Sequence, residues 1–183
     1  MAAAKKITTP PNDEIISGLR AGDEVLITGY IYTARDMAHK RLCRLIADGS
    51  DLPIDISGAI IYFVGPTPAA EGRVIGSAGP TTSSRMDNFS PILLSKGLKG
   101  MIGKGYRSDE VCKAIVRYKA VHFSALGGAG ALLSEHIKKC EIAAYPDLGT
   151  EAIRKLFVED FPAIVAYDSF GESVYKTNKG DDF

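Results

Sequence analysis

The residues best suited to chemistry lie in a loop of small and hydroxyl side chains that runs from Gly76 to Asp87. Two glycines and a proline precede four consecutive hydroxyl residues, 81–84, and Arg85 follows directly. Backbone N–H groups at a helix start attract anions, hydroxyl groups add hydrogen bonds, and an arginine can pair with a carboxylate through two bonds. The loop therefore has the outline of an anion pocket. The alternative is an ordinary capped loop with Arg85 in a surface ion pair, because these residue types are common in loops.

A second group of candidates, Arg35, Asp36 and His39, lies at the expected start of a helix. A positive side chain in the first turn opposes the helix dipole, so the place of Arg35 indicates a role other than helix stability. His39 follows Arg35 by four residues, which puts both on one helix face. A single histidine is nevertheless more often a surface residue or a hydrogen-bonded core residue than a functional one.

A third candidate, Lys104, stands between two glycines directly after a short apolar strand expected at 101–103. Ligand sites in α/β folds lie at the carboxyl ends of strands, which suits this lysine. A nucleotide-binding P-loop is excluded, because the nearest frame has five residues between its glycines instead of four and Gly105 stands where Ser or Thr is needed. The glycines of 127–130 are a similarly weak match to a dinucleotide-binding fingerprint.

The three cysteines, Cys43, Cys112 and Cys140, raise the possibility of a metal centre. Three thiolates on a [4Fe-4S] cluster leave one iron open as a Lewis acid. However, the first two cysteines fall inside expected helices and the third begins an expected buried strand, which favours ordinary packing. Their odd number and wide spacing describe no disulfide framework and fit a reducing compartment. His122 and His136 show no metal-ligand spacing.

The composition is that of one ordinary globular domain. The 183 residues are enough for one core and few for two. Basic and acidic residues number 22 each, so no overall field gathers nucleic acid or an anionic membrane. The longest apolar stretches are far shorter than the roughly 20 residues of a membrane span, and no signal-peptide core follows the first residues. We therefore expect a cytoplasmic protein with neither nucleic acid nor membrane as a partner.

Strands and helices alternate along the chain, and this alternation must position the candidate residues. Strands are predicted at 24–32, 60–64, 73–77, 101–103, 121–126, near Ile142 and at 163–166. Helices are predicted at 34–47 with Thr33 as the cap, from Ser83 or Ser84 to about Gly97, at 108–118, from the glycines of 127–130 to Ile137, and at 150–158, with a turn at 168–171. This pattern predicts a layered α/β domain over 13–183. Residues 1–12 contain adjacent prolines and are expected to form an extended N-terminal arm.

Three segments resemble the C-terminal half of class I fumarases in their order and approximate spacing. They are Ala-Arg-Asp-Met-Ala-His-Lys-Arg at 34–41, Gly-Pro-Thr-Thr-Ser-Ser-Arg-Met-Asp at 79–87 and Gly-Lys-Gly at 103–105. The β subunits of L-tartrate dehydratases look similar. The resemblance extends from about Pro10 to Tyr175 and includes Asp-Phe-Pro-Ala at 160–163.

The resemblance implies a swivelling β/β/α domain with a mixed sheet, which closes against an α subunit holding a [4Fe-4S] cluster with one open iron. It implies that Arg35, Arg85 and Lys104 bind substrate carboxylates, and Thr82 is a further substrate-binding candidate. It also implies that Thr81 takes part in proton transfer. Because a threonine hydroxyl is a weak acid and base unless a neighbour activates it, positioning or relay of a proton is expected first.

Asp36 and His39 complete the set of catalytic candidates, with His39 expected to orient its neighbours. The cluster cysteines belong to the other half of the family, so this chain is expected to bind no metal. The leading hypothesis is reversible hydration of fumarate to (S)-malate, a step of the tricarboxylic acid cycle. The active form is expected to consist of αβ pairs in a heterotetramer.

Other functions remain open on the sequence alone. One is dehydration of L(+)-tartrate to oxaloacetate by the same chemistry. A second is a non-catalytic anion-binding module that regulates a partner. A third is a chain that binds its own cluster. Two arginines and a lysine can neutralise both carboxylates of a four-carbon acid, which favours the dicarboxylate hypotheses.

Overall fold

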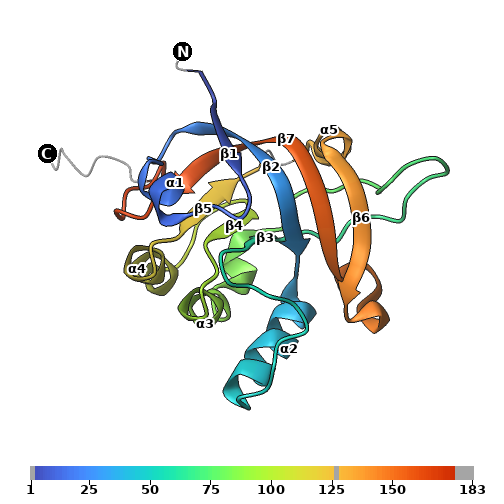
Figure 1. Ribbon diagram of the computed structural model, residues 1–183, viewed down its shortest axis with the longest axis horizontal. Helices are drawn as coiled ribbons and strands as arrows, with labels where there is room; N and C mark the ends of the chain where they lie inside the picture. The colour runs from blue at the N-terminus through green and yellow to red at the C-terminus, as the bar shows by residue number, and fades with distance from the viewer. Residues whose placement is uncertain (1–2, 126–127, 176–183) are drawn as a thin grey trace, which may run out of the picture.

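The computed structural model describes residues 3–125 and 128–175, which form a seven-stranded mixed sheet with helices beside it (Figure 1). The strands are β1 (Lys5–Thr8), β2 (Glu24–Thr33), β3 (Ile60–Tyr62), β4 (Gly100–Gly103), β5 (Val121–Ser124), β6 (Ile137–Ala144) and β7 (Ile153–Tyr167). The helices are α1 (Asp13–Ser17), α2 (Asp36–Ala47), α3 (Ser90–Ser95), α4 (Asp109–Arg117) and α5 (Gly130–Glu135), with 3-10 turns η1 (Ser83–Met86) and η2 (Pro146–Glu151). The predicted α/β class and mixed sheet are confirmed.

Part of the sheet closes into a small barrel-like ring. The strand order is β1-β2-β3-β4-β5-β7-β6, and an additional pairing joins β2 to β7. The strands β2, β3, β4, β5 and β7 therefore form a closed circuit, while β1 and β6 extend it at β2 and β7. The neighbours β2, β3, β4 and β5 run parallel, whereas β7 runs antiparallel to both β2 and β5.

Alternating side chains on β3 separate two hydrophobic cores. Ile60 and Tyr62 belong to the core inside the ring, whereas Ile61 and the next residue, Phe63, belong to the core between the sheet and the helices. This is the period of two expected of a strand covered on both faces. In Figure 1, α2, α3 and α4 lie together on the same side of the sheet, where they cover the second core.

Two features of the sequence explain the helices α2 and α4: a capped, acidic first turn in α4 and a buried apolar face in α2. Ser108, where the helix was predicted to begin, caps α4 by accepting a hydrogen bond from the amide of Val111 at 3.4 Å, and acidic residues follow in the first turn. In α2 the buried Ala38 and Leu42 are four residues apart, which places them on one face toward the sheet. Since α2 begins directly after β2, its first turn lies at the edge of the sheet where β2 ends.

The helix predicted at 150–158 is wrong, because residues 153–167 form the longest strand described, β7. Ile153 and Leu156 are buried with three-residue spacing, which imitates a helix face. Arg154 and Lys155, which lie between them, are both partly exposed, so burial does not alternate strictly at this end of the strand. Two of the three pairing partners of β7, the strands β2 and β5, are distant in the sequence and gave no local signal.

The strand predicted at 73–77 is also wrong, since these residues lie in a long loop between β3 and η1. The loop closes on itself where the amide of Thr67 donates to the carbonyl of Ser77 at 3.1 Å. Gly76 lies so near this contact that a Cβ there would be 2.3 Å from the Thr67 carbonyl oxygen. Such a close approach of two backbone segments needs glycine at position 76. Residues 73–77 belong to no strand of the sheet that the structure describes.

Several predicted boundaries shift. Thr33 is not a helix cap: it ends β2, and its hydroxyl accepts from the amide of Arg154 at 3.0 Å. The helix predicted from Ser83 or Ser84 to Gly97 is divided into η1 and α3. Within the predicted arm, residues 5–8 form β1, which pairs with β2. Leu126 and Gly127, included in a predicted strand and glycine segment, lie outside the described residues.

Candidate functional site at the carboxyl ends of β2, β3 and β4

The predicted site residues converge at one edge of the sheet. Arg35 follows β2, Phe63 follows β3 and Lys104 follows β4, and these parallel strands end side by side. The loop with the hydroxyl residues joins this edge through its backbone. The amide of Thr81 donates to the carbonyl of Phe63 at 2.7 Å, and the amide of Ser83 donates to the carbonyl of Lys104 at 2.8 Å. The carboxyl edge of parallel strands is the usual ligand position in α/β folds.

Arg85 and Asp36 form a two-point ion pair across this edge. Arg85 Nε donates to Asp36 Oδ1 at 3.0 Å, and Arg85 Nη2 lies 3.0 Å from Asp36 Oδ2. The side chain of Arg85 remains 49% exposed. A guanidinium has five N–H donors, so this pairing holds the side chain in place and leaves other donors for an incoming anion.

Arg35 lies across the backbone after β3. A Cβ added at Gly65 would be 2.7 Å from Arg35 Nη1, so the missing side chain of Gly65 makes room for the guanidinium. Arg35 Nη2 is 3.7 Å from Glu151 Oε1, and the other carboxylate oxygen of Glu151 accepts from the Met37 amide at 2.9 Å. Glu151 therefore caps α2 from a distant part of the chain, a role hidden by the incorrect helix prediction at 150–158.

Lys104, Thr81 and Thr82 line the same edge, and their side-chain polar groups have no partner among the residues that the structure describes. Thr82 and Lys104 pair as a parallel bridge, and both are exposed. Lys104 forms no ion pair with any other described residue. The site thus combines three cations, Arg35, Arg85 and Lys104, with two carboxylates, Asp36 and Glu151. The excess positive charge suits an anion.

His39 is fully buried and is held beneath Arg35. One ring nitrogen, Nδ1, lies 2.9 Å from the carbonyl oxygen of Arg35, which can only accept, so the neutral ring carries its proton there. Burial lowers the pKa of His39 to about 4. Its ring packs edge-on against Phe63 at 5.2 Å. A neutral, enclosed imidazole in this place supports the turn that carries Arg35.

A buried polar network beneath the site was missed by sequence reasoning. Its centre is Arg107, whose side chain is 0% exposed. Arg107 Nε donates to Asp87 Oδ1 at 2.7 Å and Nη2 donates to Ser90 Oγ at 2.6 Å, while Nη1 lies 3.3 Å from His122 Nδ1. Lys104 was chosen because functional residues of α/β folds lie after the carboxyl ends of strands. Arg107 follows Lys104 by three residues, so the same criterion also indicates Arg107.

The three cysteines do not fit a cluster bound by this chain. Cys43 and Cys112 pack against the core on the helix side of the sheet, whereas Cys140 packs against the core inside the ring. Burial raises the pKa of Cys43 to about 11, as is typical of a buried structural thiol. Within 3–125 and 128–175, no group of three or more His, Cys, Asp or Glu side chains could hold a metal ion.

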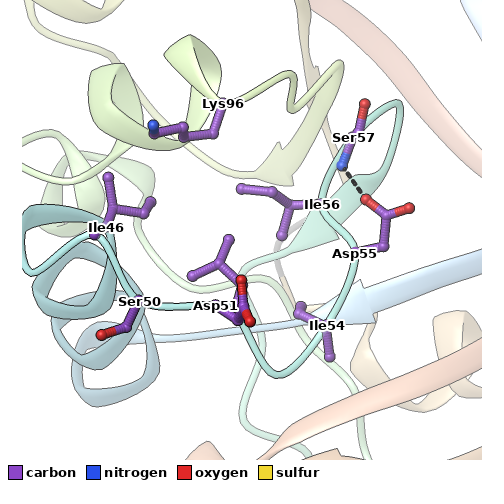
Figure 2. A pocket seen from close by; sticks show the side chains of 10 residues that line it. Ile46, Ser50, Asp51, Ile54, Asp55, Ile56, Ser57 and Lys96 are labelled. Carbon is purple, nitrogen blue, oxygen red and sulfur yellow. Dashed lines mark hydrogen bonds between the residues drawn. The ribbon is translucent and has the colours of Figure 1, made fainter.

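An open pocket at the far end of α2 is separate from these residues. It lies between the end of α2, loop 50–57 and Lys96, and Figure 2 shows Ile46, Asp51 and Asp55 around it. Arg35 and Asp36 are at the opposite end of α2, about 15 Å away by the rise of a helix. This pocket contains none of the predicted site residues.

None of the helices in the described ranges has the length and apolar character that a membrane span needs.

Comparison with known proteins places these residues in a family. The family described as "Fumarase C-terminus" matches residues 3–178. The chain is 38% identical over 179 residues to "Fumarate hydratase class I, anaerobic" of Escherichia coli, covering 95% of this chain and 33% of that protein. It is 35% identical over 162 residues to "Fumarate hydratase 2" of Leishmania major, covering 87% of this chain and 28% of that protein.

A third relative has nearly the length of this chain. The "Putative L(+)-tartrate dehydratase subunit beta" of Methanocaldococcus jannaschii is 36% identical over 167 residues, covering 88% of this chain and 86% of that protein. By contrast, the chain spans about a third of the fumarate hydratases that it matches. The resemblance predicted from the three motifs is confirmed, and the chain belongs to the fumarase C-terminus family.

Proposed function

We propose that this chain is the β subunit of an iron-sulfur-dependent hydro-lyase that converts fumarate and water reversibly to (S)-malate. The supporting observation is the meeting of Arg35, Arg85 and Lys104 at the carboxyl edge of β2, β3 and β4, beside the hydroxyls of Thr81 and Thr82. The chain provides carboxylate-binding and proton-transfer groups to a site that an α subunit completes.

The charges of the site suit a four-carbon dicarboxylate. Arg85 and Lys104 present exposed donors, and the partly buried Arg35 is the N-cap residue of α2. Asp36 and Glu151 offset part of the positive charge, which keeps the arginines ordered without substrate. Closure against a partner removes water from the edge and strengthens each ion pair, because the effective dielectric constant falls.

Thr81 is the proposed proton-transfer residue of this chain. Its amide is tied to Phe63, so the backbone is fixed, while its hydroxyl has no hydrogen-bond partner among the residues that the structure describes. A free hydroxyl at a fixed position can hold or relay the proton that joins carbon during hydration. A neighbouring group on substrate or partner must activate it, since a threonine hydroxyl is a weak acid.

The cofactor is assigned to the partner. The resemblance implies a [4Fe-4S] cluster on the α subunit, which when bound supplies an activated hydroxide to the reaction. The name of the Methanocaldococcus relative, a β subunit that matches 88% of this chain, supports a two-subunit arrangement. We propose further that αβ pairs assemble as a heterotetramer in the cytoplasm.

Reconstitution with the α subunit of the same genome, under anaerobic conditions, tests the proposal. Purified αβ assembly should hydrate fumarate, whereas neither chain alone should do so. Dehydration of L(+)-tartrate is the second candidate, favoured by the 36% identity to the Methanocaldococcus protein that is named for this reaction. Turnover of tartrate with none of fumarate would replace the first proposal by the second, and turnover of neither would leave the anion-binding module.

A further inference from the structure

Arg107 is a buried cation whose contacts join the two segments that carry the proposed carboxylate-binding residues. One segment is residues 104–108, which follow β4 and include Lys104. The other is residues 81–90, which include Arg85 and lead through η1 into α3. The guanidinium has no exposed surface, so it cannot touch an anion at the edge of the sheet.

The first set of contacts fixes the end of η1. Asp87, the residue after η1, accepts from Arg107 Nε at 2.7 Å through one oxygen and from the Ser108 amide at 2.7 Å through the other. Ser90, the first residue of α3, accepts from Arg107 Nη2 at 2.6 Å. Charge-assisted bonds of this length are among the stronger ones in proteins.

A second set of contacts reaches the start of η1. Arg107 Nη1 lies 3.3 Å from His122 Nδ1, and because a guanidinium only donates, that nitrogen accepts. The proton of the neutral ring is then on Nε2, which lies 3.2 Å from Ser83 Oγ and donates to it. Burial and the charge of Arg107 lower the pKa of His122, which keeps this ring neutral.

The backbone of the 104–108 segment is fixed as well. The Arg107 amide donates to the hydroxyl of Tyr167 at 3.0 Å, at the end of β7. Ser83 also donates its amide to the Lys104 carbonyl. The exposed Lys104 and the buried Arg107 therefore belong to one short segment, which presents one cation to solvent and encloses the other.

We propose that Arg107 is a positioning residue that sets the separation of Arg85 and Lys104 and so fits the site to the two carboxylates of a dicarboxylate. The inference rests on the proposed function. A purely structural ion pair is the alternative, since removing one partner of any buried pair destabilises a fold. The positioning role and the purely structural role predict different effects of a mutation on substrate binding. Only the positioning role predicts a changed KM in a protein that is still folded.

Arg107→Lys in the αβ assembly is the main test. Lysine keeps the charge but cannot bond Asp87, Ser90 and His122 together. The KM for fumarate should rise about tenfold while kcat stays within about threefold, because the lost interaction acts equally on bound substrate and transition state. Ser83→Ala, a smaller change, should raise KM in the same direction and decides the question if Arg107→Lys does not fold.

Asp168→Asn is the matched control. Asp168 is also a buried charge that orders loops, since it accepts from the amides of Ala21, Phe170 and Glu172. This variant should lower the melting temperature and leave KM unchanged. The positioning role is contradicted if Arg107→Lys and Ser83→Ala lower the melting temperature but leave KM at the wild-type value.

Amide hydrogen exchange in the isolated chain separates this proposal from the proposed function. Arg107→Lys should speed exchange of the Ser83 amide about tenfold while the amides of β2 keep the wild-type rate. An unchanged Ser83 rate would overturn the positioning role whatever the enzyme assay shows. If the wild-type assembly neither hydrates fumarate nor dehydrates L(+)-tartrate, the proposed function fails and the exchange rate alone decides the role of Arg107.

Discussion

Arg85 is held by Asp36 through two contacts of 3.0 Å, from Nε to Oδ1 and from Nη2 to Oδ2. The pair joins η1 to the first residue of α2, although the two residues are 49 positions apart in the sequence. The guanidinium that the proposal assigns to a substrate carboxylate is therefore oriented before substrate arrives. Such preorganisation reduces the entropy lost on binding.

Asp36→Asn should weaken substrate binding by releasing Arg85. The amide keeps the size of the carboxylate but loses its charge and one acceptor, so we expect KM for fumarate to rise about tenfold in steady-state assays of the αβ assembly. The matched control is Asp147→Asn, which breaks the similar two-point pair between Arg41 and Asp147 beside the same helix. A lower KM in Asp36→Asn would show that Asp36 competes with substrate.

Thr81→Val should reduce kcat about 100-fold with little change in KM, because it removes the hydroxyl proposed to hold a proton and keeps the shape of the side chain. Thr81→Ser should restore most of the rate. Thr82→Val is the neighbouring control, for which the main effect is expected on KM. Equal kcat values for Thr81→Val and the wild type would remove Thr81 from proton transfer.

Gly65→Ala should displace Arg35 without unfolding the chain. The new Cβ would lie 2.7 Å from Arg35 Nη1 and 3.0 Å from Arg35 Cδ, in a flexible side chain that can move away, and 3.3 Å from the carbonyl oxygen of Thr150, which needs to shift only slightly. We expect a rise in KM of about tenfold with a melting temperature close to wild type. Gly18→Ala, where a Cβ meets ordinary contacts at 3.4 Å, should change neither quantity. A large loss of melting temperature in Gly65→Ala would contradict this account.

The buried His39 should make the stability of the chain fall in acid. Its pKa is about 4 in the folded chain and near 6.5 when unfolded, so between these values the unfolded chain binds more protons. The stability present above pH 6.5 is lost as the pH falls toward 4, by about 3 kcal/mol from this residue. His122, also with a lowered pKa, adds in the same direction.

Urea denaturation of the isolated chain at several pH values from 7 to 4 measures this loss. His39→Gln should show a shallower decline than the wild type, since glutamine does not titrate. Parallel curves for the two proteins would mean that His39 is charged or exposed in the folded chain.

The site was more predictable from the sequence than the network that supports it. Local patterns in the sequence indicated all three cations of the site. Arg35 is at a helix start, Arg85 is in a hydroxyl-rich loop, and Lys104 follows the end of a strand. The contacts of Arg107 involve Asp87, Ser90 and His122, which are 15 to 20 residues away in the sequence. Nothing in local spacing shows that these side chains meet in one core.

The strand β7 shows the same limit for the fold. Its residues pair with β2, β5 and β6, and register shifts in the ladders with β2 and β5 interrupt the alternation that identifies a strand. Glu151, just before β7, was overlooked for the same reason. Strands with short loops and regular burial, such as β2 and β4, were predicted closely.

Replacement of Arg85 by alanine in the αβ assembly tests the central claim most directly. Arg44→Ala is the matched control, because Arg44 is an exposed arginine paired with Asp48 at the other end of α2. The account predicts that Arg85→Ala lowers kcat/KM for fumarate by about 100-fold or more, through loss of a charge-assisted pair to carboxylate, while Arg44→Ala matches the wild type. Equal kcat/KM values for Arg85→Ala and Arg44→Ala would contradict it.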